Sequence, residues 1–547
     1  MINALLNELK LKIKEIINEL GGDDSVDIMF EVPKDEGHGD YSTNIAMRLA
    51  KSLRKAPILI AKELISKIDC ESFHLDKIEV AGAGFINLYI DQKYLSNIIF
   101  KINKEQDDFG NLEIGKDENV LLEYVSANPT GYLHIGHGRG AAYGDSLSRI
   151  LKKAGYKVSR EHYVNDAGNQ INNLVISIYE RYKELFGLDF MLTDDCYHGK
   201  EIIEIASMIK DKHGDYYLNN DYKETFRSFG LEFLLNGLKN DLKDFHVEFD
   251  NWFSERSLYE NGDVKSTLQF LIDNGYTYEN EGAIWLKTTL EGDDKDRVLV
   301  KSDGSLTYLT PDIAYHHNKL KRGYTHLIDV LGADHHGYVS RLKAAIGFVG
   351  GNPDLLDVDL LQMVRALQNG EELKMSKRSG KAITLRDLID EVGADALRFM
   401  YISKSLDTHM DLDLDLAIKK STDNPVYYVQ YAHARISSLF RVVEESGIKF
   451  NEVNEFKLFD VSKASKLINV LLQFPAYIEM AATKRVPHKM CHYATSLARA
   501  LHTFYNDEKI ITDNIEELNE KLTLLKAVQI VLRNALNLIG VNAVDKM

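Results

Sequence analysis

Cysteine is almost absent from this chain: its 547 residues include three, Cys70, Cys196 and Cys491. Each lies far along the sequence from the next, so no pair has the short spacing of a metal-ligand or redox motif. This excludes a disulfide-stabilised scaffold, and it favours buried or half-buried thiols in a reducing cytoplasm. We expect no bound metal and no organic cofactor.

Long apolar runs are also missing, and none approaches the ~18 residues of a membrane span. Residues 1–20 have the apolar spacing of a helix but carry Glu8, Glu15 and Glu19. A secretion signal would have an apolar centre, and a transit peptide would be poor in acids. The sequence therefore predicts a cytoplasmic protein that has no removed leader and makes no membrane contact.

Proline is scarce, with eight residues, and no linker rich in Pro, Gly or Ser is present, so domain boundaries must be placed from changes in pattern. Acids outnumber bases by 83 to 66, and the formal net charge is -17. This balance disfavours nucleic-acid binding through bulk charge, but it does not exclude local basic surfaces. At roughly 150 residues per domain, the length favours about three to four domains.

Three patterns divide the chain. Residues 1–112 predict a small α/β domain, with helices over 1–20, about 44–53 and from Pro57, and a glycine-broken strand over 80–90. Residues 113–424 begin with a buried strand, a glycine-rich turn, a helix to about residue 153 and another strand. That βαβ start predicts a Rossmann-like parallel sheet of the α/β class. Residues 425–547 have helical periodicity throughout and predict an α-helical bundle.

The middle of the second segment, about residues 170–300, is acid-rich and mixed in pattern. We interpret it as an insertion between two halves of one sheet domain. Further strands are expected over 283–287, 307–310, 327–330 and 363–367.

Residues 126–137 join the first predicted strand to a glycine-rich helix start. Amide groups at a helix start are unpaired and suit a polyphosphate. His134 and His137, three residues apart, can donate to phosphate oxygens from the first turn. Gly136, Gly138 and Gly140 would let a ligand approach the backbone. A tight turn with incidental histidines is the alternative.

A second cluster, Lys374 to Lys381, has four cations on a loop of Gly and Ser. It follows Asn369-Gly370, a strong hairpin signal. Such a loop suits a clamp that closes over ATP. The alternative is a solvated basic loop. The distance from His137 far exceeds one βαβ unit of ~30 residues, so the sheet must bring the two clusters together.

The pair His134-Ile135-Gly136-His137 and Lys374-Met375-Ser376-Lys377 resembles the two-part signature of class I aminoacyl-tRNA synthetases. Longer runs resemble the arginyl-tRNA synthetase family specifically, and the resemblance covers essentially the whole chain. These runs are residues 37–41, 123–131, 163–170, 332–338 and 395–398, together with the final Met547.

The resemblance implies an arginine–tRNA ligase. Such an enzyme activates arginine with Mg-ATP to arginyl-adenylate and pyrophosphate, then transfers arginine to the 3′ end of its tRNA. It also implies a tRNA-contacting N-terminal domain, a catalytic domain and an anticodon-binding bundle, and a need for tRNA in the first step. We expect a monomer.

The resemblance also assigns residues. His134 and His137 would contact the triphosphate, with Lys374 and Lys377 closing over it as catalytic groups. The ATP site would also include Gly136, Gly332, Asp334, His335, Met375 and Ser376. The arginine pocket would use Glu123, Ser126, Asn128, Tyr308 and Asp312. The physical reason is that a guanidinium presents five donors and needs carboxylates and amide oxygens facing it.

Glu123 and Asp312 are acids on or beside predicted strand ends, where ligands bind in open parallel sheets; ordinary salt bridges are the alternative. Either Asp334 or His335 aligns with a position that is often glutamine in relatives. Tyr428, Tyr431 and Arg435 are expected to form an RNA face on the bundle, with packing as the alternative. Lys484, Arg485 and Lys489 are expected to extend the same surface.

Three other functions are alternatives for this sequence. A nicotinamide-dependent oxidoreductase fits Gly136-x-Gly138-x-x-Ala141 with Glu161 as the ribose acid, but its fingerprint would follow the strand directly. A non-catalytic RNA-binding paralogue should have lost the histidines or lysines. Another class I synthetase or a small-molecule nucleotidyltransferase is the third, and the helical tail disfavours the latter.

Overall fold

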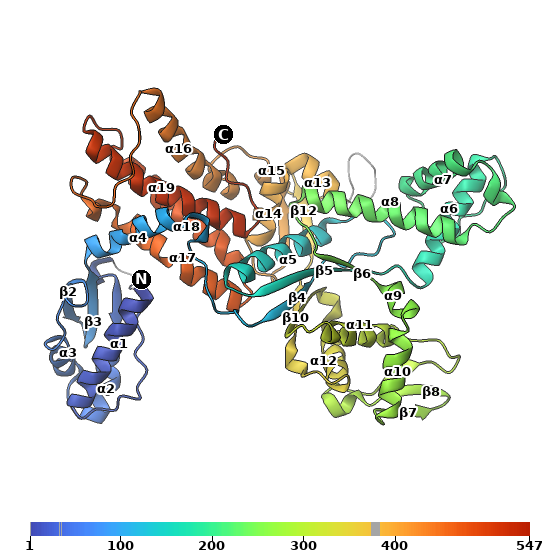
Figure 1. Cartoon of the computed structure of the whole chain (residues 1–547), viewed down its shortest axis with the longest axis horizontal. Coiled ribbons are helices and arrows are strands. Elements are labelled where there is room, and N and C mark those ends of the chain that lie inside the picture. The colour runs from blue at the N-terminus through green and yellow to red at the C-terminus, as the bar shows by residue number, and fades with distance from the viewer. Residues whose placement is uncertain (1, 32, 34–35, 374–382) are drawn as a thin grey trace.

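The computed structural model describes residues 2–31, 33, 36–373 and 383–547 (Figure 1). At its centre lies a five-stranded sheet in the order β11-β10-β4-β5-β6, and all four neighbouring pairs are parallel. The strands are β4 (Asn119–Glu123), β5 (Lys157–Val164), β6 (Asn251–Ser254), β10 (His326–Gly332) and β11 (Leu356–Leu361).

The order of the strands along the chain reverses between β4 and β10, which pair in register although about two-thirds of residues 113–424 lie between them. This is the topological switch point, where ligands bind in open parallel sheets. Helix α5 (Ile135–Lys153) follows β4 and packs on it. A Cβ on Gly144 would lie 2.2 Å from the Tyr124 ring, so only glycine permits this close packing.

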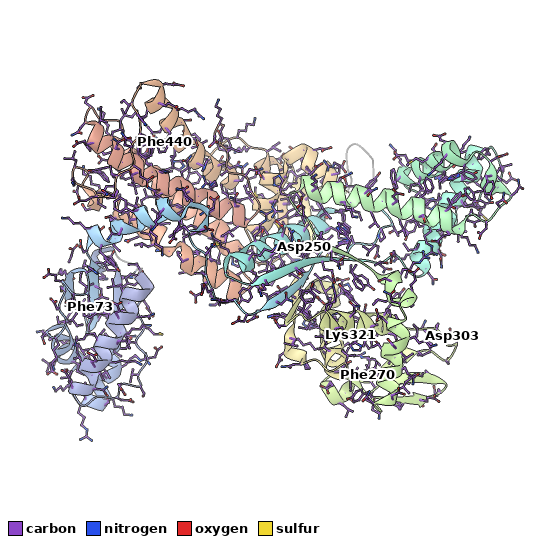
Figure 2. The ribbon with its side chains drawn as sticks, viewed as in Figure 1. Phe73, Asp250, Phe270, Asp303, Lys321 and Phe440 are labelled. Carbon is purple, nitrogen blue, oxygen red and sulfur yellow. The ribbon has the colours of Figure 1, made fainter. Side chains whose placement is uncertain are left out.

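Two expectations for the middle of the chain are wrong. Strand β6 belongs to the central sheet although it lies inside the expected insertion, and Asp250 before it pairs with Arg160 of β5 (2.8 Å; Figure 2). Residues 307–310 form no strand, because helix α11 (Leu309–Lys321) begins there with Pro311 in its first turn. Asp312 therefore lies in a helix start rather than at a strand end.

The rest of the middle segment forms two units beside the sheet. One is a helical arm at the right of Figure 1, made of α6 (Asn169–Leu185), α7 (Lys200–His213) and α8 (Lys223–Asp244), with its own apolar core. The other combines α9 (Glu255–Glu260), α10 (Asp263–Asp273), α11 and α12 (Val339–Phe348) with the antiparallel strands β7 (Thr277–Asn280), β8 (Ala283–Leu286) and β9 (Arg297–Val300).

After β11 the chain forms a small sheet in the order β13-β12-β14 and three helices. The hairpin predicted at Asn369-Gly370 is confirmed, since β12 and β13 pair as antiparallel strands across it. The elements are β12 (Val364–Gln368), β13 (Glu371–Glu372), α13 (Leu385–Val392), α14 (Ala394–Ile402), β14 (Met410–Asp413) and α15 (Leu414–Ala417).

The N-terminal unit lies at the lower left of Figure 1. It packs helices on an antiparallel sheet of order β1-β3-β2. Its elements are α1 (Ile2–Glu19), β1 (Tyr41–Thr43), α2 (Ile45–Leu53), α3 (Pro57–Ile65), β2 (Leu75–Ala81), β3 (Phe85–Ile90) and α4 (Gln92–Glu105).

The C-terminal part is helical, as expected. Its helices are α16 (Pro425–Glu445), α17 (Ser465–Thr483), α18 (His488–Asp507) and α19 (Ile515–Leu538). The α/β class, with a parallel catalytic sheet, an N-terminal α/β part and a C-terminal helical part, is thus confirmed, whereas the exact domain boundaries stay predictions. No helix in the described part of the chain combines the length and apolar character needed to cross a membrane.

Candidate active site

A cavity of about 960 Å³ opens at the switch point of the central sheet. The carboxyl ends of β4 and β10, the start of α5 and one face of α11 form its walls. The structure therefore brings together most of the residues predicted for arginine and ATP. Those that line it are Glu123, Ser126, His134, Gly136, His137, Asp312, Gly332, Asp334 and His335.

The chain leaves β4 through a sharp turn. Val125 and Ser126 have φ values of 70° and 41°, a region that L-residues, and β-branched ones above all, rarely adopt. The turn aims the Ser126 hydroxyl back at the strand end, where its Oγ donates to Glu123 Oε1 at 2.8 Å. The unusual backbone thus places both polar groups on the cavity wall.

Helix α5 begins with a reciprocal cap made by the two histidines. The Gly136 amide donates to His134 Nδ1 (3.1 Å), and the His134 amide donates to His137 Nδ1 (3.2 Å). The two rings stack with centroids 3.6 Å apart. Since each Nδ1 accepts a hydrogen bond, each neutral ring carries its proton on Nε2 and can donate it to a ligand.

The electrostatics keep these rings neutral. Burial lowers the pKa of His134, and burial together with the neighbouring His134 and His162 lowers the pKa of His137 to about 3. The pair therefore offers two N–H donors without fixed charge at a helix N-terminus, whose dipole favours an anion.

The glycines of this helix start have different roles. Gly136 and Gly140 line the cavity, as expected for close approach of a ligand. Gly138 does not, and the expectation for it is wrong: a Cβ there would lie 2.9 Å from Leu385 Cδ1 and 3.1 Å from the Tyr401 ring. Gly138 is small because protein side chains pack against it.

The acidic wall of the cavity is built around Asp312 in the first turn of α11. Burial raises the pKa of Asp312 to about 6, while a hydrogen bond from the Tyr338 hydroxyl opposes that rise. Behind it lies Glu255, which is 8% exposed. Burial, with the nearby Asp312 and Asp166 carboxylates, raises the pKa of Glu255 to about 7. Burial makes negative charge on these carboxylates unfavourable, and a bound cation would stabilise it.

Some predicted residues lie elsewhere. Asn128 is exposed and does not line the cavity, and Tyr308 has 83% of its surface exposed. Lys374, Met375, Ser376 and Lys377 lie outside the described residues. The described chain that follows them returns to the first signature, because Thr384 forms a bridge with His134 and the Leu385 amide donates to Leu133 O (2.7 Å).

Sequence reasoning missed several residues of the cavity and its supports, notably Tyr338, Glu255 and Lys319. Asp312, His316 and Lys319 recur at helical spacing of four and three residues, which places them on one face of α11. That polar stripe on a helix was a signal available in the sequence. Glu255 and Tyr338 had no comparable signal, because only the tertiary fold brings them to Asp312.

The residues predicted to bind RNA fall into two separate groups. On α16, Tyr431 stacks with His502 of α18 (centroids 5.7 Å apart), and the Arg435 guanidinium lies 3.8 Å from the Tyr505 ring centroid. Tyr428 also contacts His502. Lys489 lies in the first turn of α18, and at 1.5 Å per residue the helix separates it from His502 by about 20 Å. The two groups therefore lie apart on the bundle, and the RNA surface expected to join them stays a prediction.

Arg485 has partners within the protein. It is half-buried, and it pairs with Asp357 (2.7 Å) and Asp359 (3.0 Å) of β11. Its carbonyl also accepts from the Tyr143 hydroxyl (3.0 Å). These contacts tie the bundle to the catalytic sheet, so the expectation that Arg485 faces RNA conflicts with its position. Lys484 is exposed and Lys489 half-buried.

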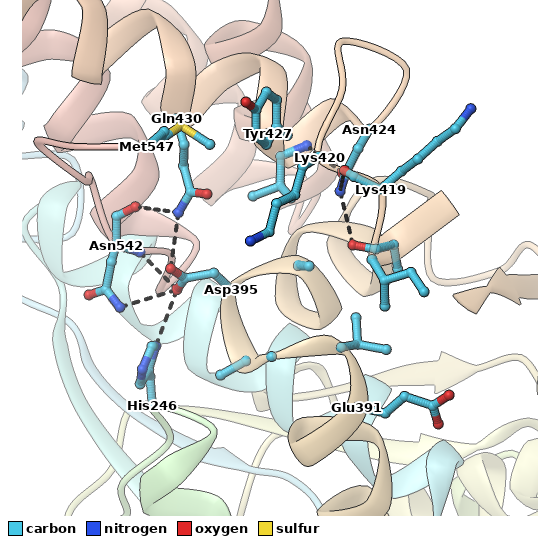
Figure 3. A pocket seen from close by; sticks show the side chains of 17 residues that line it. His246, Glu391, Asp395, Lys419, Lys420, Asn424, Tyr427, Gln430, Asn542 and Met547 are labelled. Atoms are coloured by element: carbon cyan, nitrogen blue, oxygen red, sulfur yellow. Dashed lines mark hydrogen bonds and ion pairs between the residues drawn. The ribbon is translucent and has the colours of Figure 1, made fainter. Parts of the chain in front are cut away.

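A second cavity of about 570 Å³ lies beside α16, where the bundle meets α14 (Figure 3). Asp395 is central to it: it accepts from Gln430 Nε2 (3.0 Å) and from the Asn542 amide (3.0 Å). Lys419, Lys420, Tyr427 and the C-terminal Met547 also line it. Polar, basic and aromatic groups thus meet next to the predicted RNA-binding helix.

A parallel sheet with a histidine-capped, glycine-rich helix start at its switch point defines the catalytic domain of a class I aminoacyl-tRNA synthetase. Comparisons with known families agree: residues 99–436 match the class I (R) catalytic domain of tRNA synthetases, residues 7–90 the arginyl-tRNA synthetase N-terminal domain, and residues 429–547 the DALR anticodon-binding domain. The chain belongs to the arginyl-tRNA synthetase family.

Individual relatives extend along the whole chain. It is 49% identical to the arginine–tRNA ligase of Geobacillus thermodenitrificans, with 100% of both chains covered. It is 50% identical to that of Bacillus subtilis, with 95% of this chain and 94% of the relative covered. The solved arginyl-tRNA synthetase of Thermus thermophilus, at 20% identity, shares the fold with a TM-score of 0.73 over 99% of this chain and 100% of that one.

Proposed function

We propose that this chain is an arginine–tRNA ligase that works in two steps. The arginine carboxylate attacks the α-phosphorus of ATP, forming arginyl-adenylate as the bond to pyrophosphate breaks. The terminal adenosine hydroxyl of tRNA(Arg) then attacks the arginyl carbonyl, and AMP leaves. The observation that carries the proposal is one cavity with phosphate-type donors on one wall and a buried acidic wall on the other.

The ATP end rests on His134, Gly136 and His137. Two Nε2–H donors and a helix N-terminus can stabilise the charge that develops on the phosphate oxygens. Gly332, Asp334 and His335 form the part of the same cavity at the end of β10, which suits the adenosine. Lys374 and Lys377, with Met375 and Ser376, are proposed to close over the triphosphate. Mg²⁺ is proposed as the ion that accompanies ATP.

The arginine end rests on the acids. Asp312 is proposed to bind the guanidinium, whose planar fork of donors matches a carboxylate. Glu255 lies behind it, and Glu123 and Ser126 approach from the end of β4. Asn128 and Tyr308 remain proposed ligands that would act from the cavity mouth. Catalysis would depend on positioning and charge stabilisation rather than on a covalent enzyme intermediate.

For tRNA, we propose Tyr428, Tyr431 and Arg435 as a stacking surface, because aromatic and guanidinium planes bind unstacked bases; Tyr431 is exposed and the other two are half-buried. The cavity at Lys419 and Lys420 adjoins it. Lys484 and Lys489 are proposed as separate phosphate contacts. We also propose that the chain works as a cytoplasmic monomer; light scattering tests the monomer.

Pyrophosphate exchange with each amino acid, with and without tRNA, tests the function. We expect exchange with arginine alone among the standard amino acids. Exchange with another amino acid, or none with arginine in the presence of its tRNA, would contradict the assignment.

A further inference from the structure

Three acids stand in a row across the carboxyl end of the central sheet. Asp329 of β10 is the register partner of Glu123 of β4, and Glu123 is in turn the register partner of Glu161 of β5. All three are buried. Like charges directly opposite on neighbouring strands repel each other, so this row needs cations.

Helix α11 and the residue after it supply two. Lys319 is 0% exposed, and its Nζ donates to Glu123 Oε2 at 2.6 Å and to Asp329 Oδ1 at 2.8 Å. Arg322, three residues later, pairs with Glu161 at 2.5 and 2.8 Å. His316, also on α11, is a second partner of Asp329, with Nε2 2.9 Å from Oδ2, whereas Lys319 is the cation that contacts Glu123.

Two of the three acids belong to the cavity wall. Glu123 and Asp329 line the cavity, whereas Glu161 does not. A buried ion pair is weak evidence for stability, because desolvation offsets most of its attraction. A fully buried lysine between two cavity acids therefore needs a reason other than folding.

The geometry at Glu123 gives a reason for the buried lysine. Lys319 holds Oε2 and the Ser126 hydroxyl holds Oε1, so the carboxylate plane is fixed from two sides. A carboxylate has about four acceptor positions, and two of them stay free for a ligand. Asp312 lies on the same face of α11 as Lys319, so the lysine also anchors the helix that carries it.

We propose that Lys319 is a positioning residue for the amino-acid substrate: by pairing with Glu123 and Asp329, it orients the Glu123 carboxylate toward the substrate's positive charge. This inference rests on the proposed function. Lys319 does not touch the substrate; it acts through Glu123.

Lys319→Met tests it, because methionine keeps the length of the side chain and removes the ammonium. We expect the KM for arginine in pyrophosphate exchange to rise at least about tenfold, the scale of one charged hydrogen bond. The KM for ATP should stay within about twofold, and a merely structural role would not separate the two constants.

Arg322→Met is the matched control. It breaks a helix–sheet ion pair of the same kind beside the same helix, but its partner Glu161 does not line the cavity. We expect a comparable fall in melting temperature and an unchanged KM for arginine. An equal rise in both variants would show general loosening of α11 and overturn the inference.

If Lys319→Met alone does not fold, Lys319→Met with Asp329→Asn removes one acid together with the base and keeps the net charge of the cavity. We expect this double variant to fold and to retain the raised KM, because Glu123 is still unsupported. A KM for arginine within about twofold of wild type, in either variant, refutes the role. A wild-type protein that fails to activate arginine would instead refute the proposed function.

Discussion

Replacing Asp312 with asparagine should make the protein more stable and a poorer enzyme. The substitution keeps the shape of the side chain and an oxygen that can accept from the Tyr338 hydroxyl, but it removes the buried charge. Without substrate, that charge has no partner among the described side chains comparable to the Lys319 ammonium beside Glu123. Stability and arginine affinity are therefore expected to move in opposite directions.

The magnitude follows from the pKa of Asp312, which burial raises from 3.8 to about 6. At about 1.4 kcal/mol per pH unit, the buried carboxylate costs about 3 kcal/mol of unfolding free energy above pH 6. The sign is that of a raised acid: the unfolded chain loses the proton first, so stability falls as pH rises from about 4 to 6 and is constant above. Asparagine does not titrate, and its advantage should build up over that window.

Thermal unfolding at pH 5 and pH 8, with and without arginine, measures this. At pH 8 we expect the variant without arginine to melt higher than wild type, with a smaller difference at pH 5. Added arginine should raise the melting temperature of wild type but hardly that of the variant. A ligand stabilises the folded protein more the more tightly it binds, and the variant is expected to bind arginine weakly. In kinetics the KM for arginine should rise at least about tenfold, for a charged hydrogen bond of ~1.5–3 kcal/mol, while the KM for ATP stays put. A variant that melts lower at pH 8, or that keeps its arginine KM, would refute the reasoning.

Other perturbations test the remaining parts of the site. Lys377→Ala should lower the rate of pyrophosphate exchange by about two orders of magnitude with little change in melting temperature, as for one lost transition-state contact; wild-type turnover would rule out the clamp. Exchange with arginine and ATP should be near background until cognate tRNA is added, if RNA binding orders the site; robust exchange without RNA would contradict this. Lys484→Ala with Lys489→Ala should weaken tRNA binding and flatten its salt dependence, since each phosphate contact releases about one counterion. Arg485→Ala should instead lower stability, because it removes the guanidinium that pairs with Asp357 and Asp359, and a loss of tRNA affinity at unchanged stability would support the expectation that Arg485 faces RNA.

Features set by a few neighbouring residues were predictable from the sequence. The hairpin at Asn369-Gly370 and the stop of α5 before Gly155 depend on local backbone preferences, and both are present. The strand expected over 307–310 is absent, because Pro311 favours a helix start and outweighs the strand preference of Thr and Tyr. Strand β6 was missed because four residues give no reliable period, and only pairing with β5 makes them a strand.

The candidate site also has parts that the sequence predicts and parts that only the fold reveals. The β4–α5 junction was found because its histidines, glycines and strand end are contiguous, and the fold adds only the strained turn at Val125 and Ser126. The ion pairs of Arg485 were not predictable, because a basic residue in a polar loop gives no indication of acids on β11 far away in the sequence. Glu255 and Tyr338 likewise depend on contacts that only the folded chain makes.

Helix α11 shows what a sequence can still reveal about such contacts. Its buried residues include the apolar Ile313 and Ala314, but also His316 and Lys319, which share one side of the helix with Asp312. Buried charges reduce stability unless they are paired, so they persist on a core-facing stripe only where they serve another purpose. Here Asp312 and Glu123 lie beside the cavity in which a cationic amino acid is proposed to bind. A helix whose core-facing positions are charged is therefore a predictor of a ligand site even when no motif marks it.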